Sequence, residues 1–413
     1  MRPQRTTTSR AVPFARADIV PEAQRAAVQA MRSGWITMGP ETAEFEAQLE
    51  RYLGARHVVA VASCTAAIEI AIRSLRLPPG AVVLTPSLTF CGAVAPIVQA
   101  GLRPVLVDVA ADTLQPTPAS IAAAVLRVGK PAAMIVQHMA GRPADVQLLA
   151  AAADLPANRV VEDSAHGLGA ELRGIPLGGT SYAACFSFYA TKNLPIGEGG
   201  AIATVDAELA DYARTVRLHG LSRDAWRRYL PGGSWRYDVA EPGLKANMTD
   251  VQAAIGRAQL TRLTAWQARR EELARQYEDA LTGIPGLVLP SRPADARHAW
   301  HLYQVRVTAE FGVSRDDAID ELRSLGIGTS VHFIPVHQLS AYRRILGPEE
   351  IASVPVTDQV AAELLSLPMY PALADGDVDH VAAALAAVAA RPRRGKHVLK
   401  NGGERVELAG HTA

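Results

Sequence analysis

The sequence predicts an α/β protein with a large, mainly parallel, doubly wound sheet and a smaller C-terminal α/β domain. Short apolar segments alternate with helical segments from residue 58 to residue 204. This order is typical of a parallel sheet with helices on both faces. The chain has 413 residues, which exceeds the size of one ordinary hydrophobic core, so two domains are expected.

Each domain has its own set of expected elements. Strands of the large domain are expected at 58–62, 81–84, 104–107, 133–136, 159–162, 183–188 and 200–204. A long helix is expected at 248–281, either continuous or broken near Thr264. After it, the expected elements of the small domain are strands at 285–289, 302–308 and 327–333 and a helix at 316–324. We therefore expect a large domain over residues 14–262, a small domain over 263–390, and disordered tails at 1–13 and 391–413.

Charge and cysteine content exclude several classes of partner. The 42 Lys and Arg residues balance the 41 Asp and Glu residues, so no basic surface for nucleic acid is expected. No apolar stretch has the length and purity of a membrane span. The odd set of cysteines, Cys64, Cys91 and Cys185, predicts free thiols in a reducing compartment, with no disulfide framework and no metal site. We expect a cytoplasmic protein.

Lys192 lies where a chain can present a reactive amine. An apolar strand ends near Ser187, and a Pro/Gly-rich turn follows the lysine. Burial among apolar neighbours lowers the pKa of a lysine, and the neutral amine can attack a carbonyl to form a Schiff base. Because most lysines are solvated surface charges, this interpretation depends on a second segment.

That second segment is the apolar run that ends at Asp163, with His166 three residues later. The carboxyl ends of strands in open α/β sheets are where ligands bind. Together the two segments supply a carboxylate, an imine-forming amine and the hydroxyl of Ser187. These groups suit pyridoxal 5′-phosphate (PLP): a lysine for its aldehyde, an aspartate for its pyridine nitrogen and donors for its phosphate.

A helix that begins after Ser63 offers a further phosphate site. Its first residues have small side chains, and the free backbone N–H groups of Thr65 and Ala66 can approach a phosphate, favoured by the helix dipole. Any capped helix has a similar start, so this segment alone identifies no ligand.

The order of these motifs resembles the DegT/DnrJ/EryC1/StrS family, the PLP-dependent sugar aminotransferases of aspartate aminotransferase fold (fold type I). The resemblance extends from about Phe14 to about Ala390. It implies that Lys192 holds PLP as an internal aldimine and that Asp163 keeps the pyridine nitrogen protonated. It also implies the remaining cofactor contacts: Phe90 stacked on the ring, unless it only fills the core, His166 near the ring hydroxyl or face, and Ser187, Thr65 and Ala66 on the phosphate.

The segment 243–256 resembles the family's most recognisable helix entry but departs from it. Many members read Gly-Tyr-Asn-Tyr-Arg-Met there, whereas this chain has Lys245 at the Asn place and Asn247 at the Arg place. In the family a residue of this loop reaches the cofactor phosphate of the other subunit. The resemblance therefore implies a homodimer with shared active sites, in which Asn247, or Lys245 in its stead, makes this contact.

Two further residues are implied to face the substrate, Trp35 and His332. Each also has a purely structural interpretation: Trp35 as a buried side chain in a helix connector, and His332 as a satisfied histidine in an apolar strand.

The function implied is transfer of an amino group, from glutamate, to a keto sugar, either a 4-keto or a 3-keto sugar linked to a nucleotide. Amination of a keto-inositol and PLP- or PMP-dependent sugar dehydration are the alternatives, although the dehydrating relatives have a histidine at the place of Lys192. A non-catalytic subunit that binds a sugar nucleotide is a third alternative, from a different class of function.

Overall fold

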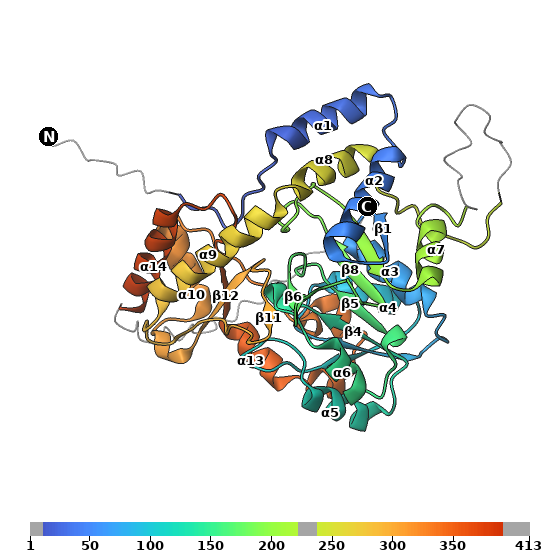
Figure 1. Ribbon diagram of the computed structural model, residues 1–413. Coiled ribbons are helices and arrows are strands. Elements are labelled where there is room, and N and C mark those ends of the chain that lie inside the picture. Colours follow the sequence, from blue (N-terminus) through green and yellow to red (C-terminus); the bar gives the residue numbers. More distant parts are fainter. Residues whose placement is uncertain (1–10, 222–237, 391–413) are drawn as a thin grey trace, which may run out of the picture.

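The computed structural model describes residues 11–221 and 238–390 (Figure 1). The tail predicted at 391–413 and residues 1–10 lie outside the described residues. The large domain is built on a seven-stranded sheet of order β1-β9-β8-β5-β4-β2-β3. Its strands are β1 (His57–Val61), β2 (Val82–Pro86), β3 (Arg103–Val107), β4 (Ala133–Gln137), β5 (Val160–Asp163), β8 (Ala183–Ser187) and β9 (Gly200–Thr204).

The predicted strands and their mainly parallel arrangement are confirmed. The neighbouring pairs among β8, β5, β4, β2 and β3 are parallel, and β9 runs antiparallel to both β8 and β1. In this register Asp163 pairs with Cys185 and with Gln137. The carboxyl ends of β4, β5 and β8 therefore meet at one edge of the sheet, so polar residues there lie together.

Helices cover both faces of this sheet (Figure 1). Along β1, Val59 and Val61 face one apolar core, whereas Val58 and Ala60 face another. Since successive side chains of a strand point to opposite faces, both faces of the sheet are buried. The helices up to residue 260 are α1 (Pro21–Arg32), α2 (Pro40–Leu53), α3 (Cys64–Ser74), α4 (Cys91–Gln99), α5 (Pro118–Val128), α6 (Val146–Ala152), α7 (Ala207–Val216) and α8 (Asp250–Leu260).

The helix predicted at 248–281 is broken into two close to Thr264, the place where the sequence allows a break. After α8 the chain turns at Thr261 and Arg262 and continues as α9, Leu263–Leu281. The described chain also contains α10 (Arg315–Ser324), α11 (Ser340–Arg343), α12 (Pro348–Ile351), α13 (Pro355–Glu363) and α14 (Asp375–Ala389). A small separate sheet has the order β11 (Ala296–Arg297), β6 (Glu171–Leu172), β7 (Ile175–Pro176).

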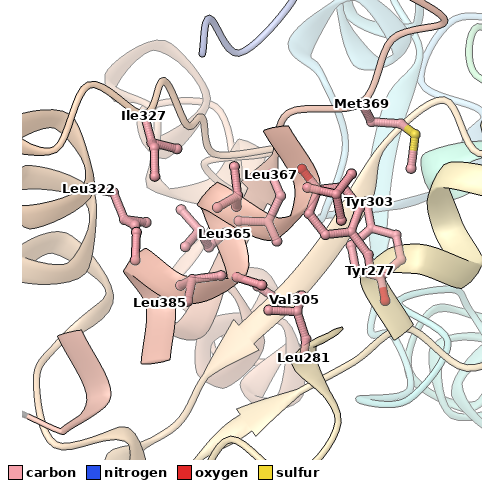
Figure 2. Close-up of a cluster of buried hydrophobic side chains, with 14 of the residues drawn as sticks. Tyr277, Leu281, Tyr303, Val305, Leu322, Ile327, Leu365, Leu367, Met369 and Leu385 are labelled. Carbon is pink, nitrogen blue, oxygen red and sulfur yellow. The ribbon is translucent and has the colours of Figure 1, made fainter. Parts of the chain in front are cut away.

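The second core lies around a three-stranded sheet of order β10 (Leu287–Val288), β12 (Tyr303–Val307), β13 (Leu364–Leu367). Figure 2 shows its buried side chains, in which the rings of Tyr277 and Tyr303 stack at 4.8 Å between centroids. The third strand comes from 364–367 and not from 327–333, which makes only single bridges at Ile327 and Ser330. The strand predicted at 327–333 is therefore wrong, because its backbone pairs with two different segments.

Two packing features bear on the predicted domain limits. Val12 lies in the small core and pairs with Ile327, so it is packed although the sequence predicted disorder over 1–13. Further along the chain, Val336 and Tyr342 pack against Val94 of the large domain. The C-terminal half therefore contacts both cores, and the boundary at residue 262 stays a prediction.

Asp250, the first residue of α8, fixes the start of α2. Its carboxylate is 2% exposed and accepts hydrogen bonds from Gly39 N at 2.7 Å, Thr42 N at 3.0 Å and Thr42 Oγ1 at 2.7 Å. A carboxylate at a helix N-terminus satisfies free N–H groups and interacts favourably with the helix dipole.

We predict that Asp250→Ala lowers the free energy of unfolding by at least about 3 kcal/mol, because several buried donors lose their acceptor. Urea denaturation of the two proteins measures the difference. Asp320→Ala is the matched control, because its carboxylate pairs with Arg323 at a site where both side chains are over 70% exposed, and about 0.5 kcal/mol or less is expected there. Equal midpoints for Asp250→Ala and the control would contradict the prediction.

Candidate active site

A cavity of about 400 Å³ opens at the carboxyl ends of β5 and β8. One side of the cavity consists of the start of α3 and of residues that follow β2, β5 and β8. The other side consists of Phe14 and of segments from the C-terminal half of the chain. Seven residues predicted from the sequence line it: Thr65, Phe90, Asp163, His166, Ser187, Lys192 and His332.

Lys192 is held in this cavity by the loop that joins β8 to β9. Phe188 N donates to Gly199 O at 2.9 Å and Ile196 N to Phe188 O at 3.0 Å, so the ends of the loop are fixed. Burial lowers the pKa of Lys192 to about 8, although the charge of Asp163 and the Cys64 thiol favour the ammonium form. A substantial fraction of the amine is therefore neutral near pH 8, as nucleophilic attack requires.

Asp163 is a buried carboxylate that lacks a cationic hydrogen-bond partner among the described residues. It is 4% exposed. Oδ1 accepts from Ala165 N at 3.1 Å and lies 3.9 Å from Cys64 Sγ. Burial raises the pKa of Asp163, against the backbone hydrogen bond and the charge of Lys192. A cationic group in the cavity would stabilise the charged carboxylate.

Two neutral histidines lie beside Lys192. His301 Nε2 is 3.5 Å from Lys192 Nζ, and the His301 ring is 4.4 Å from the ring of His166, between centroids. Burial, with the Lys192 charge, lowers the pKa of both histidines well below the usual value. His166 Nδ1 accepts from Ala140 N at 3.2 Å, so its proton is on Nε2.

The mouth of the cavity is aromatic. Phe90 is 58% exposed, and its ring lies 5.9 Å from that of Phe333, between centroids. His332 stacks on Phe14 at 5.4 Å between centroids, and its Nδ1 lies 3.0 Å from Ser366 Oγ. Burial, with the Lys192 charge, lowers the pKa of His332 to about 4, so this imidazole is neutral at physiological pH.

The start of α3 differs from its predicted role at one residue. Ala66 N donates to the side chain of its own cap, Ser63 Oγ, at 3.1 Å, and Ala66 does not line the cavity. Its amide is therefore already paired, whereas Thr65 borders the open space. Gly200, the first residue of β9, lets the backbone of β9 lie close to the start of α3, because a Cβ at this residue would lie 2.6 Å from Cys64 N.

Three predicted residues lie away from the Lys192 cavity of the same chain. Trp35 Nε1 donates to Met38 O at 3.2 Å, and its side chain borders a different cavity, between α1, α2 and α8. Helix α1 runs along α8 (Figure 1), and Trp35 follows α1 at its end. Asn247 bridges to Val61, and Lys245 Nζ donates to Asn247 Oδ1.

Several lining residues were not predicted, above all His301, Phe333 and Gln137. His301 lies two residues before strand β12, and a polar residue in that place was the available signal. Nothing in the sequence order shows that the start of β12 approaches Lys192, since this depends on how the two sheets pack.

A second set of side chains has the order of a nucleophile, a base and an acid, but it serves packing. Ser87 Oγ lies 2.6 Å from His337 Nδ1, and His337 Nε2 lies 2.8 Å from Asp358 Oδ1. Ser87 is fully buried and borders neither the Lys192 cavity nor the cavity beside Trp35. A hydroxyl that no substrate can reach cannot act as a nucleophile, so this cluster ties the segment after Pro335 to the end of β2.

Within residues 11–221 and 238–390, no group of His, Cys, Asp or Glu side chains has the arrangement of a metal site. Over the same residues, no helix combines the length and the apolar character needed to cross a membrane.

Comparison with known proteins gives a consistent result. Residues 17–386 match the model of the DegT/DnrJ/EryC1/StrS aminotransferase family. The chain is 43% identical over 355 residues to the spore coat polysaccharide biosynthesis protein SpsC of Bacillus subtilis, which covers 86% of this chain and 90% of that protein.

Solved structures resemble the fold over nearly its whole length. The putative sugar aminotransferase Spr1654 from Streptococcus pneumoniae, solved in PLP and PMP forms, is 30% identical with a TM-score of 0.83, covering 92% of this chain and 99% of that one. DesV of S. venezuelae, solved in complex with a ketimine intermediate, is 33% identical with a TM-score of 0.82 and the same coverage. The chain therefore belongs to the DegT/DnrJ/EryC1/StrS aminotransferase family, and it is a PLP-dependent sugar aminotransferase.

Proposed function

We propose that this enzyme transfers an amino group from glutamate to the keto group of a nucleotide-linked sugar, and that Lys192 is the reactive amine. The observation that carries the proposal is the buried amine of Lys192, with a pKa of about 8, in a cavity that it shares with Asp163. A lysine at this place favours transamination over dehydration, because the resemblance implies a histidine there in the relatives that dehydrate sugars.

The lining of the cavity fits PLP. Asp163 lacks a cationic partner among the described residues, and a protonated pyridine nitrogen would supply one. Gln137, beside Asp163 in the sheet, has a buried Oε1 with no hydrogen-bond partner within residues 11–221 and 238–390. When bound, PLP supplies an electron sink for the amino-transfer chemistry.

We assign roles to the chain's own groups accordingly. Lys192 would hold PLP at its aldehyde carbon and, as a free amine, would move the proton at the reacting carbon. Asp163 would accept a hydrogen bond from the ring nitrogen, and Phe90 would pack on the ring. The hydroxyls of Ser187 and Thr65 would bind the phosphate at the start of α3. His166 and His332 would offer neutral imidazoles to the ring hydroxyl and to the substrate, respectively.

The active unit we propose is a homodimer. Lys245 and Asn247 are absent from the Lys192 cavity of their own chain, as expected of residues that reach the phosphate bound in the other subunit. Trp35, which borders a different cavity, contributes to a substrate site only across such an interface.

Lys192→Ala is expected to reduce turnover by at least about 10³-fold, since the variant loses both the attachment point and the general base. The test records the visible absorbance of the PLP-loaded protein before and after addition of glutamate. Wild type should lose the band and gain that of pyridoxamine phosphate, and the exposed-site control Lys130→Ala should behave like wild type. A wild-type band that glutamate leaves unchanged would refute glutamate as the donor, and retained turnover in Lys192→Ala would refute the role of Lys192.

The lowered pKa of Lys192 predicts a pH dependence. The neutral amine increases as pH rises through the pKa, so acetylation of Lys192 in the cofactor-free protein should reach half its maximal rate near pH 8. Peptide mass spectrometry follows the label, with the exposed Lys130 as internal reference for reagent decay. A midpoint at the ordinary value of a lysine, above about 10, would contradict burial of the amine.

Mixed dimers test the contact across the interface. We expect Asn247→Asp to be inactive because its carboxylate repels the phosphate, and Lys192→Ala to be inactive as above. Equal amounts refolded together should regain roughly a quarter of wild-type activity, because half of the dimers are hybrids and one of their two sites is intact. If Asn247 acted within its own subunit, both sites of every hybrid would be defective and no activity would return.

A further inference from the structure

Asn193, the residue after Lys192, has an amide group whose orientation is determined by its surroundings. The side chain is 4% exposed. Its Nδ2 donates to Ala299 O at 2.9 Å and to Leu168 O at 3.3 Å. Because carbonyl oxygens only accept, the atom that faces them must be the nitrogen, and Oδ1 must point the other way.

Asn193 Oδ1 lies 3.1 Å from His301 Nδ1. An amide oxygen only accepts hydrogen bonds, so His301 Nδ1 must carry a proton. A neutral imidazole has a single ring proton, which leaves a lone pair on Nε2. That lone pair faces Lys192 Nζ at 3.5 Å.

The surroundings of His301 keep it neutral. The charged and titratable groups that face it are Lys192, His166, His332 and Arg270, whose guanidinium donates to His301 O at 3.4 Å and to Trp300 O at 3.0 Å. Each of these is a cation or a base, so none stabilises an imidazolium. His301 therefore has only one protonation state compatible with its neighbours.

We propose that Asn193 and His301 are positioning residues that hold the free amine of Lys192 by a fixed histidine tautomer. Asn193 fixes the proton on Nδ1, and Nε2 accepts a hydrogen bond from Nζ. The amine then keeps its place in the cavity whenever it is not bound to the cofactor. This inference rests on the proposed role of Lys192 as the reactive amine, but the tautomer itself is measured without turnover.

Three other buried histidines show the opposite tautomer and serve as internal references. In each of them Nδ1 accepts a hydrogen bond from a backbone N–H. The donor is Ala144 N for His138 (3.0 Å), Ala140 N for His166 (3.2 Å) and Trp300 N for His298 (2.8 Å). Their protons are therefore on Nε2. Of these four histidines, His301 alone carries its proton on Nδ1.

The test is ¹⁵N NMR of the cofactor-free full-length protein with ¹⁵N-labelled histidine. His301 is assigned by the signal lost in His301→Gln, and the references by the corresponding variants. We expect His301 to show a protonated Nδ1 and an unprotonated Nε2 near neutral pH, opposite to His166 and His298. A His301 protonated on Nε2, or on both nitrogens, would overturn the proposal whether or not the protein transaminates.

A matched pair of variants tests the consequence for catalysis. Gln places a polar group where Nε2 lies, whereas Asn places one where Nδ1 lies and leaves Lys192 without its acceptor. We expect His301→Asn to lower kcat by roughly 10²-fold with little change in KM, and His301→Gln to stay within roughly 10-fold of wild type, since misplacing a reacting group mainly affects the chemical step. Equal losses in the two variants would overturn the positioning role.

Discussion

The Lys192 amine and the Asp163 carboxylate share a cavity in which burial opposes both charges. Desolvation lowers the pKa of the amine to about 8 and raises that of the carboxylate, while their mutual attraction works in the other direction. The balance leaves an amine that is partly neutral near physiological pH and a carboxylate in need of a cation. A PLP ring with a protonated nitrogen would meet that need, and this is the physical basis of the roles that we propose for the two residues.

The backbone around this pair is arranged to keep it buried. Asp163 ends β5 and lies in register with Cys185 of β8, so the loop that carries Lys192 begins beside the carboxylate. The other wall comes from the C-terminal half, where Arg270 of α9 donates to the carbonyl groups of Trp300, His301 and Met369. A guanidinium shared among three carbonyls holds the chain segments that carry His301 and Met369 against the cavity, and burial lowers the pKa of Arg270 to about 9.

Neutral histidines give the cavity a particular chemistry. His166, His301 and His332 all have lowered pKa values, so they act as hydrogen-bonding groups and not as charges. Among the residues that line the cavity, Lys192 is the only lysine or arginine. The proposed dimer is consistent with this composition, because Lys245 and Asn247 would add polar groups from the second subunit.

The sequence by itself determined the strands of the large sheet, the free cysteines and the seven predicted residues that line the cavity. The strands, Thr65, Asp163, Ser187 and Lys192 follow from local signals: apolar runs between turns, and polar residues near the ends of strands, which meet at one edge. Phe90 and His332 were implied only by the resemblance to the family, which also implied the contact of His166 with the cofactor. Thr65, Asp163, Ser187 and Lys192 all belong to such junctions.

Only the tertiary structure decided the rest. His301, Phe333 and Phe14 come from segments whose position depends on how the small sheet packs against the large one. That packing cannot be predicted from the order of the residues. The same reason explains the misplaced strand at 327–333, whose partners Val12 and Ser366 are distant in the chain. Ala66 and Trp35 are two predicted site residues that do not line the Lys192 cavity. The Ala66 amide is at the predicted start of α3, but it is paired with Ser63 Oγ. Trp35 borders a different cavity, next to α8. Local patterns fix which residues end a strand or begin a helix, whereas side-chain contacts between distant segments depend on the packing of whole layers.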